Sequence, residues 1–238
     1  MAHVALFHSV YGRRPAVLAA AERLRAAGHT VTAPDLYAGR LAATAEDGFV
    51  LCDQVGWQAI LRRARQALDG WPPDTVLAGL SMGASVAAGL LDERPTTAGL
   101  LLLHNTGGSD EAAVRVGLPV QLHIADPDEY QSAAEVARWE RAMTSAGAMV
   151  QLFRYPGAGH LFTDPGTPGR DDQAAALAWQ RSLRFLGSLR SLRPRSGKRA
   201  AAAPARRALT ARCGWLDLIR KDNRIVCPAR RGNVRGDC

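Results

Sequence analysis

The sequence predicts an α/β fold in which a mostly parallel sheet of about six strands is covered by helices on both faces. Segments with strand character alternate with segments of helical periodicity almost throughout residues 1–189. Several strand segments are continuously apolar, as expected for strands that are covered on both faces. The chain of 238 residues is also long enough for one large domain, and its hydrophobic content of 47% is sufficient for a full core.

Six strands are expected along the chain. The first covers residues 3–7, and the second covers residues 30–33 and ends at Pro34, which has no N–H to donate to a ladder. The remaining strands are expected at residues 75–78, 98–103, 119–124 and 149–155.

Helices are expected between these strands, at residues 14–27, 47–68, 84–91, 132–146 and 171–186. The first should end at Gly28, because glycine readily adopts the left-handed conformation of a helix C-terminus. Ser132 and Gly147 are suited to begin and end the fourth. Asp171 should lie at the positive end of the last helix. The helix at 47–68 contains two glycines, which disfavour helical conformation.

Charge divides the chain into two predicted parts. Residues 1–189 carry 16 Lys/Arg and 19 Asp/Glu, whereas residues 190–238 carry 14 and 3. The first part is the predicted folded domain. The second is rich in Arg, Ala and Pro without apolar periodicity, and we expect a basic, disordered, low-complexity tail. A basic arm can attract nucleic acid, but we favour a dispensable extension and expect no nucleic-acid partner for the folded part.

Several other classes of protein are disfavoured. The N-terminal residues lack a basic region followed by a long apolar stretch, and the apolar run at 98–103 is too short to span a bilayer, so we expect a cytoplasmic protein without membrane association. Cys52 is the one cysteine before the tail, which disfavours a disulfide framework. Neither metal-ligand spacing nor a G-x-G-x-x-G motif is found, so no metal or organic cofactor is expected. The sequence carries no signal for the oligomeric state.

The segment 79–83, Gly-Leu-Ser-Met-Gly, is the strongest functional motif. It joins a predicted strand to a predicted helix, which is the setting in which G-x-S-x-G forms a nucleophile elbow. The serine, Ser81, would then be exposed above the carboxyl end of the sheet and beside the amino end of a helix, where N–H groups can stabilise an oxyanion. A glycine-rich turn that merely begins a helix is the alternative.

A serine hydroxyl becomes a useful nucleophile when a base accepts its proton, and histidine is the usual base. His160 follows the last strand and comes after the serine, as the chain order of hydrolases with this elbow requires. His8 and His104 also follow strands and are not excluded by position. A histidine also needs an acid to orient it. Asp126 and Asp128 both follow the fifth strand, and spacing alone does not separate them.

Two N–H donors are needed for an oxyanion hole. The amide of Met82 should supply one, because it directly follows the nucleophile. The loop after the first strand, residues 9–12, should supply the other.

From residue 4 to residue 186 the sequence resembles the dienelactone hydrolase family of α/β-hydrolases. The resemblance rests on five segments: residues 8–12 (HSVYG), 33–37 (APDLY), the elbow, the acid-containing loop at 124–129, and residues 155–162 (YPGAGHLF). It implies an α/β-hydrolase fold with Ser81 as nucleophile, His160 as base and Asp128 as acid. It also implies that the backbone amides of Val10 and Met82 are the oxyanion donors.

Two features differ from the best-known family members. Those have cysteine at the nucleophile position and glutamate where this chain has Ser9. The resemblance therefore implies an esterase-like variant rather than an enzyme specific for dienelactone. We expect a hydrolase that cleaves a small carboxylic ester or lactone through an acyl-enzyme. The alternatives are a catalytically silent binding protein of the same fold and an acyltransferase or thioesterase.

Overall fold

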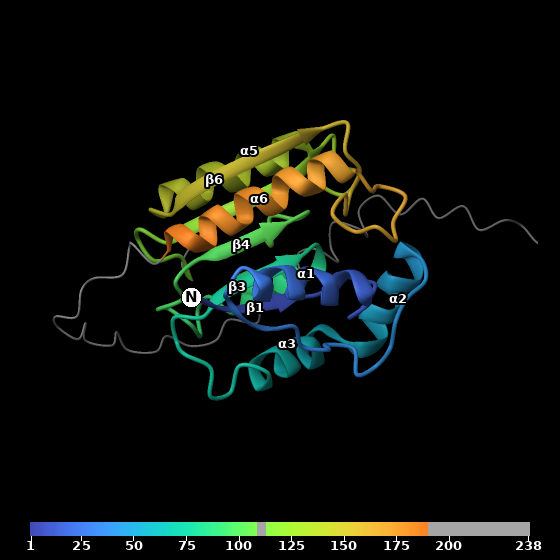
Figure 1. The fold of residues 1–238 in the computed structure, drawn as a ribbon, viewed down its shortest axis with the longest axis horizontal. Helices are drawn as coiled ribbons and strands as arrows, with labels where there is room; N and C mark the ends of the chain where they lie inside the picture. The colour runs from blue at the N-terminus through green and yellow to red at the C-terminus, as the bar shows by residue number, and fades with distance from the viewer. Residues whose placement is uncertain (109–112, 190–238) are drawn as a thin grey trace, which may run out of the picture. The chain divides into compact units, whose positions relative to one another are not determined.

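The computed structural model describes residues 1–108 and 113–189 and contains a six-stranded parallel sheet, as the sequence predicts (Figure 1). The order of the strands in the sheet is β2-β1-β3-β4-β5-β6, and every neighbouring pair is parallel. The strands are β1 (His3–Phe7), β2 (Thr30–Thr32), β3 (Val76–Leu80), β4 (Leu100–Leu103), β5 (Pro119–Asp126) and β6 (Met149–Pro156).

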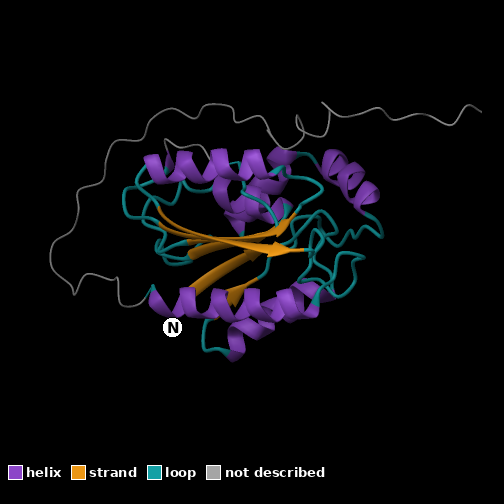
Figure 2. Cartoon of the chain, turned by 90° about the horizontal axis from the view of Figure 1, so that it is seen from above, coloured by secondary structure: helices purple, strands orange, loops and turns teal. Residues whose placement is uncertain are grey.

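Helices cover both faces of the sheet (Figure 2). They are α1 (Pro15–Ala26), α2 (Ala45–Val55), α3 (Trp57–Gln66), α4 (Met82–Gly89), α5 (Ala133–Ser145) and α6 (Asp172–Ser188). Buried side chains of α1 and α6 belong to one hydrophobic cluster with β1, β3 and β4, so these two helices share a face. Right-handed crossovers between parallel strands place α3, α4 and α5 on the other face.

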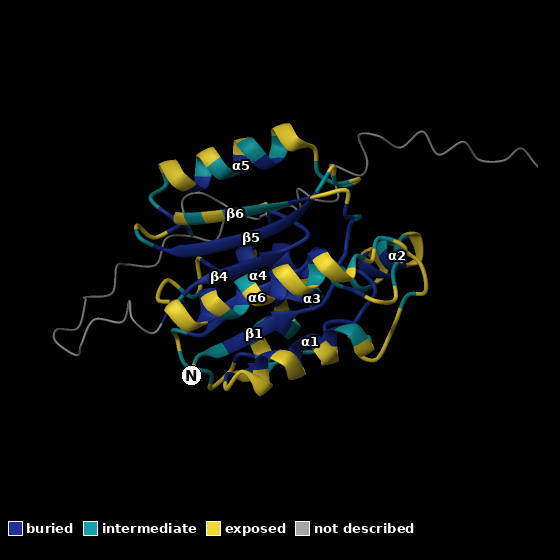
Figure 3. Ribbon diagram, turned by 45° about the horizontal axis from the view of Figure 1, so that its top comes forward, coloured by how far each residue is buried: buried dark blue, intermediate teal, exposed yellow. Residues whose placement is uncertain are grey.

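The centre of the sheet is the most deeply buried part of the molecule (Figure 3). Every residue of β3 and β4 is buried, which agrees with their apolar sequences. Seven of the eight residues of α4 are also buried, although most of them are small. The small side chains allow α4 to lie close against the sheet directly after the elbow.

One predicted helix is wrong in extent. We expected a single helix over residues 47–68, but the chain forms α2 and α3 with a break at Gly56. Gly56 has φ of 80° and ψ of 136°, a backbone conformation that favours glycine and cannot continue a helix. Gly48, the other glycine of this segment, lies inside α2 and is favoured by close packing, because a Cβ there would lie 2.9 Å from the carbonyl oxygen of Val10.

The predicted helix ends agree with the structure to within two residues. Ser132 caps α5 by accepting a hydrogen bond from the amide of Glu135, and the side chain of Glu135 in turn accepts one from the Ser132 amide. Asp171 caps α6 by accepting a hydrogen bond from the amide of Ala174. These local signals are readable in the sequence because both partners lie within one turn of helix.

The strand order positions the loops that follow β1 and β3 at the carboxyl end of the sheet. From β1 the chain crosses to β2 on one side, and from β3 it crosses to β4 on the other side. The loops that follow β1 and β3 therefore diverge at the carboxyl ends of these two strands. Open parallel sheets bind ligands at such a point. The predicted basic tail at 190–238 lies outside the described residues.

Candidate active site

The G-x-S-x-G segment forms a sharp turn between β3 and α4. Ser81 has φ of 52° and ψ of −112°, a conformation that is costly for a residue with a side chain. A Cβ at Gly79 would lie 2.1 Å from the backbone of Gly83, and one at Gly83 would lie 2.2 Å from the carbonyl oxygen of Phe7. Both glycines are therefore required by close backbone approach, as expected for a nucleophile elbow.

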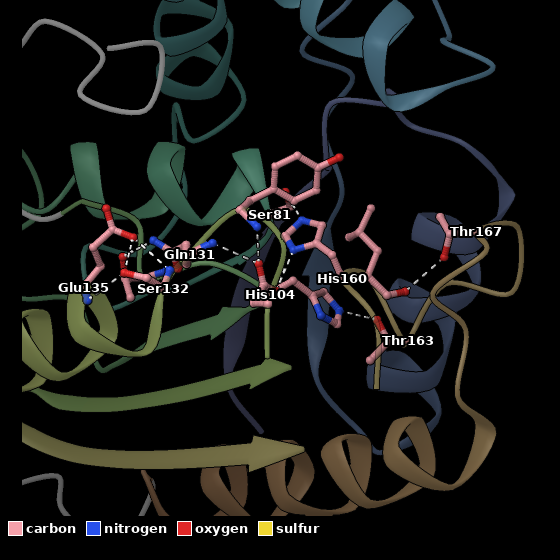
Figure 4. A network of polar contacts seen from close by, with 12 residues as sticks. Ser81, His104, Gln131, Ser132, Glu135, His160, Thr163 and Thr167 are labelled. Atoms are coloured by element: carbon pink, nitrogen blue, oxygen red, sulfur yellow. Dashed lines mark hydrogen bonds and ion pairs between the residues drawn. The ribbon is translucent and has the colours of Figure 1, made fainter. Parts of the chain in front are cut away.

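The structure brings Ser81, His160 and Asp128 together, although they follow three different strands. Ser81 Oγ lies 2.9 Å from His160 Nε2 (Figure 4), and His160 Nδ1 lies 2.9 Å from Asp128 Oδ2. A carboxylate oxygen accepts, so Nδ1 carries the proton and Nε2 is free to accept the proton of the serine hydroxyl. The arrangement can pass a proton from the hydroxyl to the imidazole.

The geometry also separates the two candidate acids. Asp128 reaches His160, and its second oxygen accepts hydrogen bonds from the amides of Tyr130 at 2.9 Å and Gln131 at 3.2 Å. Its side chain is 1% exposed, so these bonds compensate a carboxylate removed from water. Asp126 is the last residue of β5, and among the described residues the hydrogen bond and ion pair of His160 Nδ1 go to Asp128, with none to Asp126.

The two predicted oxyanion donors are buried beside the serine. Met82 is the first residue of α4, where amide groups lack helical partners and the helix dipole is positive. Val10 lies in the loop after β1 and lines the same cavity as Ser81. In the described part of the chain, the amides of Val10 and Met82 donate no hydrogen bond, which leaves both available to a ligand.

Neither of the other two histidines that follow strands reaches Ser81. His8 is fully buried, and both of its ring nitrogens are bonded to backbone groups. Nε2 of His104 lies 2.7 Å from the hydroxyl of Thr163 (Figure 4). Burial lowers the pKa of His104 well below its usual value, and the nearby rings of His160 and His123 lower it further. His104 therefore stays neutral beside His160, where a second positive charge would oppose protonation of the base.

Sequence reasoning did not find two further features of the site. The ring of Tyr130 packs edge-on against His160, with centroids 4.6 Å apart. Burial raises the pKa of Tyr130 to about 12, with a smaller contribution from Glu129, so its hydroxyl stays protonated. Arg14 Nε donates to Asp164 Oδ2 at 2.8 Å, which ties the loop after β1 to the loop that carries His160. These partners are 150 residues apart, and no local pattern indicates the pair.

A cavity of about 380 Å³ opens beside Ser81 and His160. Its walls come from the loops after β1, β5 and β6 and from the segment that begins α2. Glu46 and Glu129 are the charged carboxylates in the lining, and in the described part of the chain no Lys or Arg lines it. The remaining lining residues are Val10, Tyr11, Ala43, Thr44, Ala45, Phe49, Tyr130, Leu161, Gly166, Thr167, Pro168 and Gly169.

The described residues contain no group of three or more His, Cys, Asp or Glu side chains that could hold a metal ion. Across the same residues, no helix has the length and apolar character needed to cross a bilayer.

The elbow, the parallel sheet and the serine, histidine and aspartate that meet at its carboxyl edge define the class of α/β-hydrolases. The sequence matches the model of the dienelactone hydrolase family over residues 2–189. The chain therefore belongs to the dienelactone hydrolase family, and it is a hydrolase that acts on ester bonds. A search of curated proteins finds no match.

Solved structures of this class share the fold at low sequence identity. A dienelactone hydrolase-like promiscuous phosphotriesterase from metagenomic libraries is 19% identical, with a TM-score of 0.64 over 79% of this chain and 87% of that one. A Klebsiella pneumoniae protein assigned as a dienelactone hydrolase is 16% identical, with a TM-score of 0.66 over 77% of this chain and 85% of that one. Esterase 2 of Thermogutta terrifontis, phosphorylated by paraoxon, is 18% identical, with a TM-score of 0.52 over 82% and 85%.

Proposed function

We propose that this chain hydrolyses small carboxylic esters or lactones through an acyl-enzyme formed on Ser81. The observation that carries the proposal is the continuous hydrogen-bonded series from Ser81 through His160 to Asp128, with both links at 2.9 Å. Packing alone requires no such series. A catalytically silent binding protein would need neither the strained serine nor two unpaired amides beside it.

In the acylation step, Ser81 Oγ attacks the carbonyl carbon while its proton passes to His160 Nε2. The carbonyl oxygen becomes negatively charged and accepts hydrogen bonds from the amides of Val10 and Met82. Asp128 stabilises the imidazolium that forms. When the tetrahedral intermediate collapses, the bond to the leaving oxygen breaks and that oxygen takes the proton from His160.

Deacylation repeats the same steps with water as the nucleophile. His160 removes a proton from water, and the hydroxide attacks the ester carbonyl carbon of acyl-Ser81. The bond to Ser81 Oγ then breaks, and His160 returns the proton to that oxygen. The carboxylic acid product leaves, and the enzyme is restored without any cofactor.

The charges in the cavity favour a neutral substrate. Glu46 and Glu129 line it without an accompanying Lys or Arg among the described residues, so a carboxylate on the substrate would be repelled. Three aromatic rings, from Tyr11, Phe49 and Tyr130, offer apolar contact. We therefore propose neutral esters or lactones as the substrates. A location in the cytoplasm remains a prediction from the sequence.

Replacement of the nucleophile tests the proposal. Ser81→Ala should abolish hydrolysis of short p-nitrophenyl esters, while Ser85→Ala, a buried serine one turn further along α4, should retain it. Both variants should show the thermal unfolding midpoint of the wild-type protein to within a few degrees. Unchanged hydrolysis by a folded Ser81→Ala protein would contradict the assignment.

A further inference from the structure

The amide of Val10 belongs to the same peptide unit as the carbonyl of Ser9. In a planar trans peptide the C=O and the following N–H point in opposite directions. Whatever fixes the direction of the Ser9 carbonyl therefore also fixes the direction of the Val10 N–H. The groups that hold this carbonyl thus control one of the two proposed oxyanion donors.

Two donors hold the Ser9 carbonyl oxygen. The amide of Gly12 donates to it at 3.1 Å and closes a four-residue turn, and His8 Nδ1 lies 2.7 Å from it. Gly12 has φ of 86°, and a Cβ there would lie 2.7 Å from the carbonyl oxygen of Arg40. The turn is therefore closed by a glycine, and the second, shorter bond comes from a side chain.

The two contacts of His8 leave only one tautomer. A carbonyl oxygen can only accept, so Nδ1 carries the proton, whereas Nε2 faces the amide of Leu36 at 3.0 Å and must accept. Burial lowers the pKa of His8 to about 4, which agrees with a neutral ring. With both nitrogens occupied, His8 has no atom left to serve as a base for Ser81.

The segment that holds His8 also reaches the second proposed donor. The ring of Tyr37 packs edge-on against His8 with centroids 4.9 Å apart, and its hydroxyl donates to the sulfur of Met82 at 3.1 Å. Arg63 donates to the carbonyl of Leu36 at 2.7 Å and so fixes this segment from α3. Leu36 and Tyr37 are both fully buried, which makes them a rigid support.

We propose that His8 is a positioning residue of the oxyanion hole: its Nδ1–H holds the Ser9 carbonyl and thereby directs the Val10 amide at the oxygen of the substrate. The inference rests on the proposed ester hydrolysis. The same inference assigns a function to residues 33–37: Leu36 and Tyr37 contact His8 and hold its ring in place from outside the active site.

Two substitutions separate the two hydrogen bonds of His8. In His8→Asn the side-chain amide can occupy the place of Nδ1 and donate to Ser9, but nothing reaches Leu36. In His8→Gln the side-chain oxygen can occupy the place of Nε2 and accept from Leu36, but the donor to Ser9 is lost. The proposal predicts that kcat for a p-nitrophenyl ester falls about 10- to 100-fold in His8→Gln and stays within about threefold of wild type in His8→Asn.

The loss should affect the transition state rather than substrate binding. In His8→Gln, KM should change less than about twofold, and affinity for a trifluoromethyl ketone, which forms an oxyanion on Ser81, should fall in step with kcat. A purely structural role would instead lower thermal stability and leave kcat of the folded fraction unchanged.

The outcomes separate this inference from the proposed function. An inactive wild-type protein would contradict the proposed function itself. An active wild type with a folded His8→Gln protein of unchanged kcat, or with equal losses in both variants, would overturn the role of His8. If His8→Gln does not fold, His8→Asn decides alone, since a tenfold or greater loss of kcat in the folded His8→Asn protein would also overturn it.

Discussion

The nucleophile elbow and the loop after β1 lie side by side in the site but are held in different ways. The elbow is fixed by close backbone packing, because a Cβ at Gly79 would clash with the backbone of Gly83 and one at Gly83 would clash with the backbone of Phe7. The loop after β1 is fixed by distant partners: His8 contacts Leu36, and Arg14 contacts Asp164. Substitution of either elbow glycine should therefore disrupt the fold, whereas changes to the loop after β1 should lower activity and stability in smaller steps.

The largest expected effect is in the elbow. Gly83→Ala would place a Cβ against the backbone of Phe7, which cannot move without disrupting β1, so we expect no folded protein. Gly89→Ala is the matched control at the end of the same helix, because its Cβ would meet only Leu61 at an ordinary 3.6 Å. Circular dichroism and gel filtration measure both. A stable, folded Gly83→Ala protein would show that the elbow is less constrained than its geometry indicates.

Substitution of the acid should have the next largest effect. Asp128→Asn removes the negative charge that stabilises the imidazolium and permits the wrong tautomer of His160, so kcat should fall about 10³- to 10⁴-fold. Asp126→Asn is the control and should change kcat less than about threefold, since the hydrogen bond of His160 Nδ1 goes to Asp128 and not to Asp126. Equal effects of the two substitutions on the rate of ester hydrolysis would contradict the choice of Asp128.

The loop after β1 should make stability dependent on pH. Burial lowers the pKa of His8 to about 4; the hydrogen bond to the Ser9 carbonyl and the charge of Asp35 act to raise this pKa, and the charge of Arg13 acts to lower it. The unfolded chain binds this proton near pH 6.5. Between about pH 6.5 and 4 the unfolded state therefore holds more protons, so stability is full above pH 6.5 and falls as the pH is lowered, by about 3 kcal/mol for this group.

Urea unfolding of wild type and His8→Asn at pH 7 and pH 4.5 checks this dependence. His123, whose pKa burial lowers to about 3, should give a similar fall in both proteins, so the difference between them isolates His8. Identical pH dependence in the two proteins would mean that His8 does not titrate as its burial requires.

The ion pair that joins two loops should contribute less. Arg14→Met leaves Asp164 buried without its partner, and the free energy of unfolding should fall by about 2–3 kcal/mol. Arg65→Met, which breaks the exposed pair with Glu93, is the control and should cost less than about 1 kcal/mol. Chemical denaturation measures both. A smaller loss for Arg14→Met than for Arg65→Met would show that this pair does not hold the loops together.

The smallest expected effect concerns substrate charge. Glu46→Gln and Glu129→Gln each remove one negative charge from the lining of the cavity. The ratio of kcat/KM for an anionic ester to that for a neutral ester of the same size should rise about two- to fivefold per substitution, and less at high salt. Glu22→Gln, an exposed residue of α1 outside the cavity, is the control. No change in the ratio would mean that these carboxylates do not select substrates.

The comparison also explains what the sequence could predict. The strands, the elbow and the helix caps at Ser132 and Asp171 depend on neighbours within a few residues, and these predictions agree with the structure. The sequence could also predict that Ser81, Asp128 and His160 lie on the same side of the sheet. Each follows a strand, and parallel strands have their carboxyl ends on one side.

The remaining features depend on contacts between distant segments. The break at Gly56 follows from a backbone conformation, φ of 80° and ψ of 136°, that glycine permits but does not require, so the glycine alone could not specify it. Spacing left Asp126 and Asp128 equivalent, and only the family resemblance favoured Asp128; in the folded loop it is Asp128 that lies against His160. The partners of His8 and Arg14 are 28 and 150 residues away, beyond any local pattern.

Mass spectrometry of the protein treated with paraoxon tests the central claim most directly. A serine activated by His160 should be phosphorylated once, on the peptide that contains Ser81, and hydrolysis of p-nitrophenyl esters should be lost in proportion. Ser81→Ala should take up no label, and His160→Gln should label at least about 100-fold more slowly. An enzyme that hydrolyses esters while Ser81 stays unmodified and another residue carries the label would contradict the account.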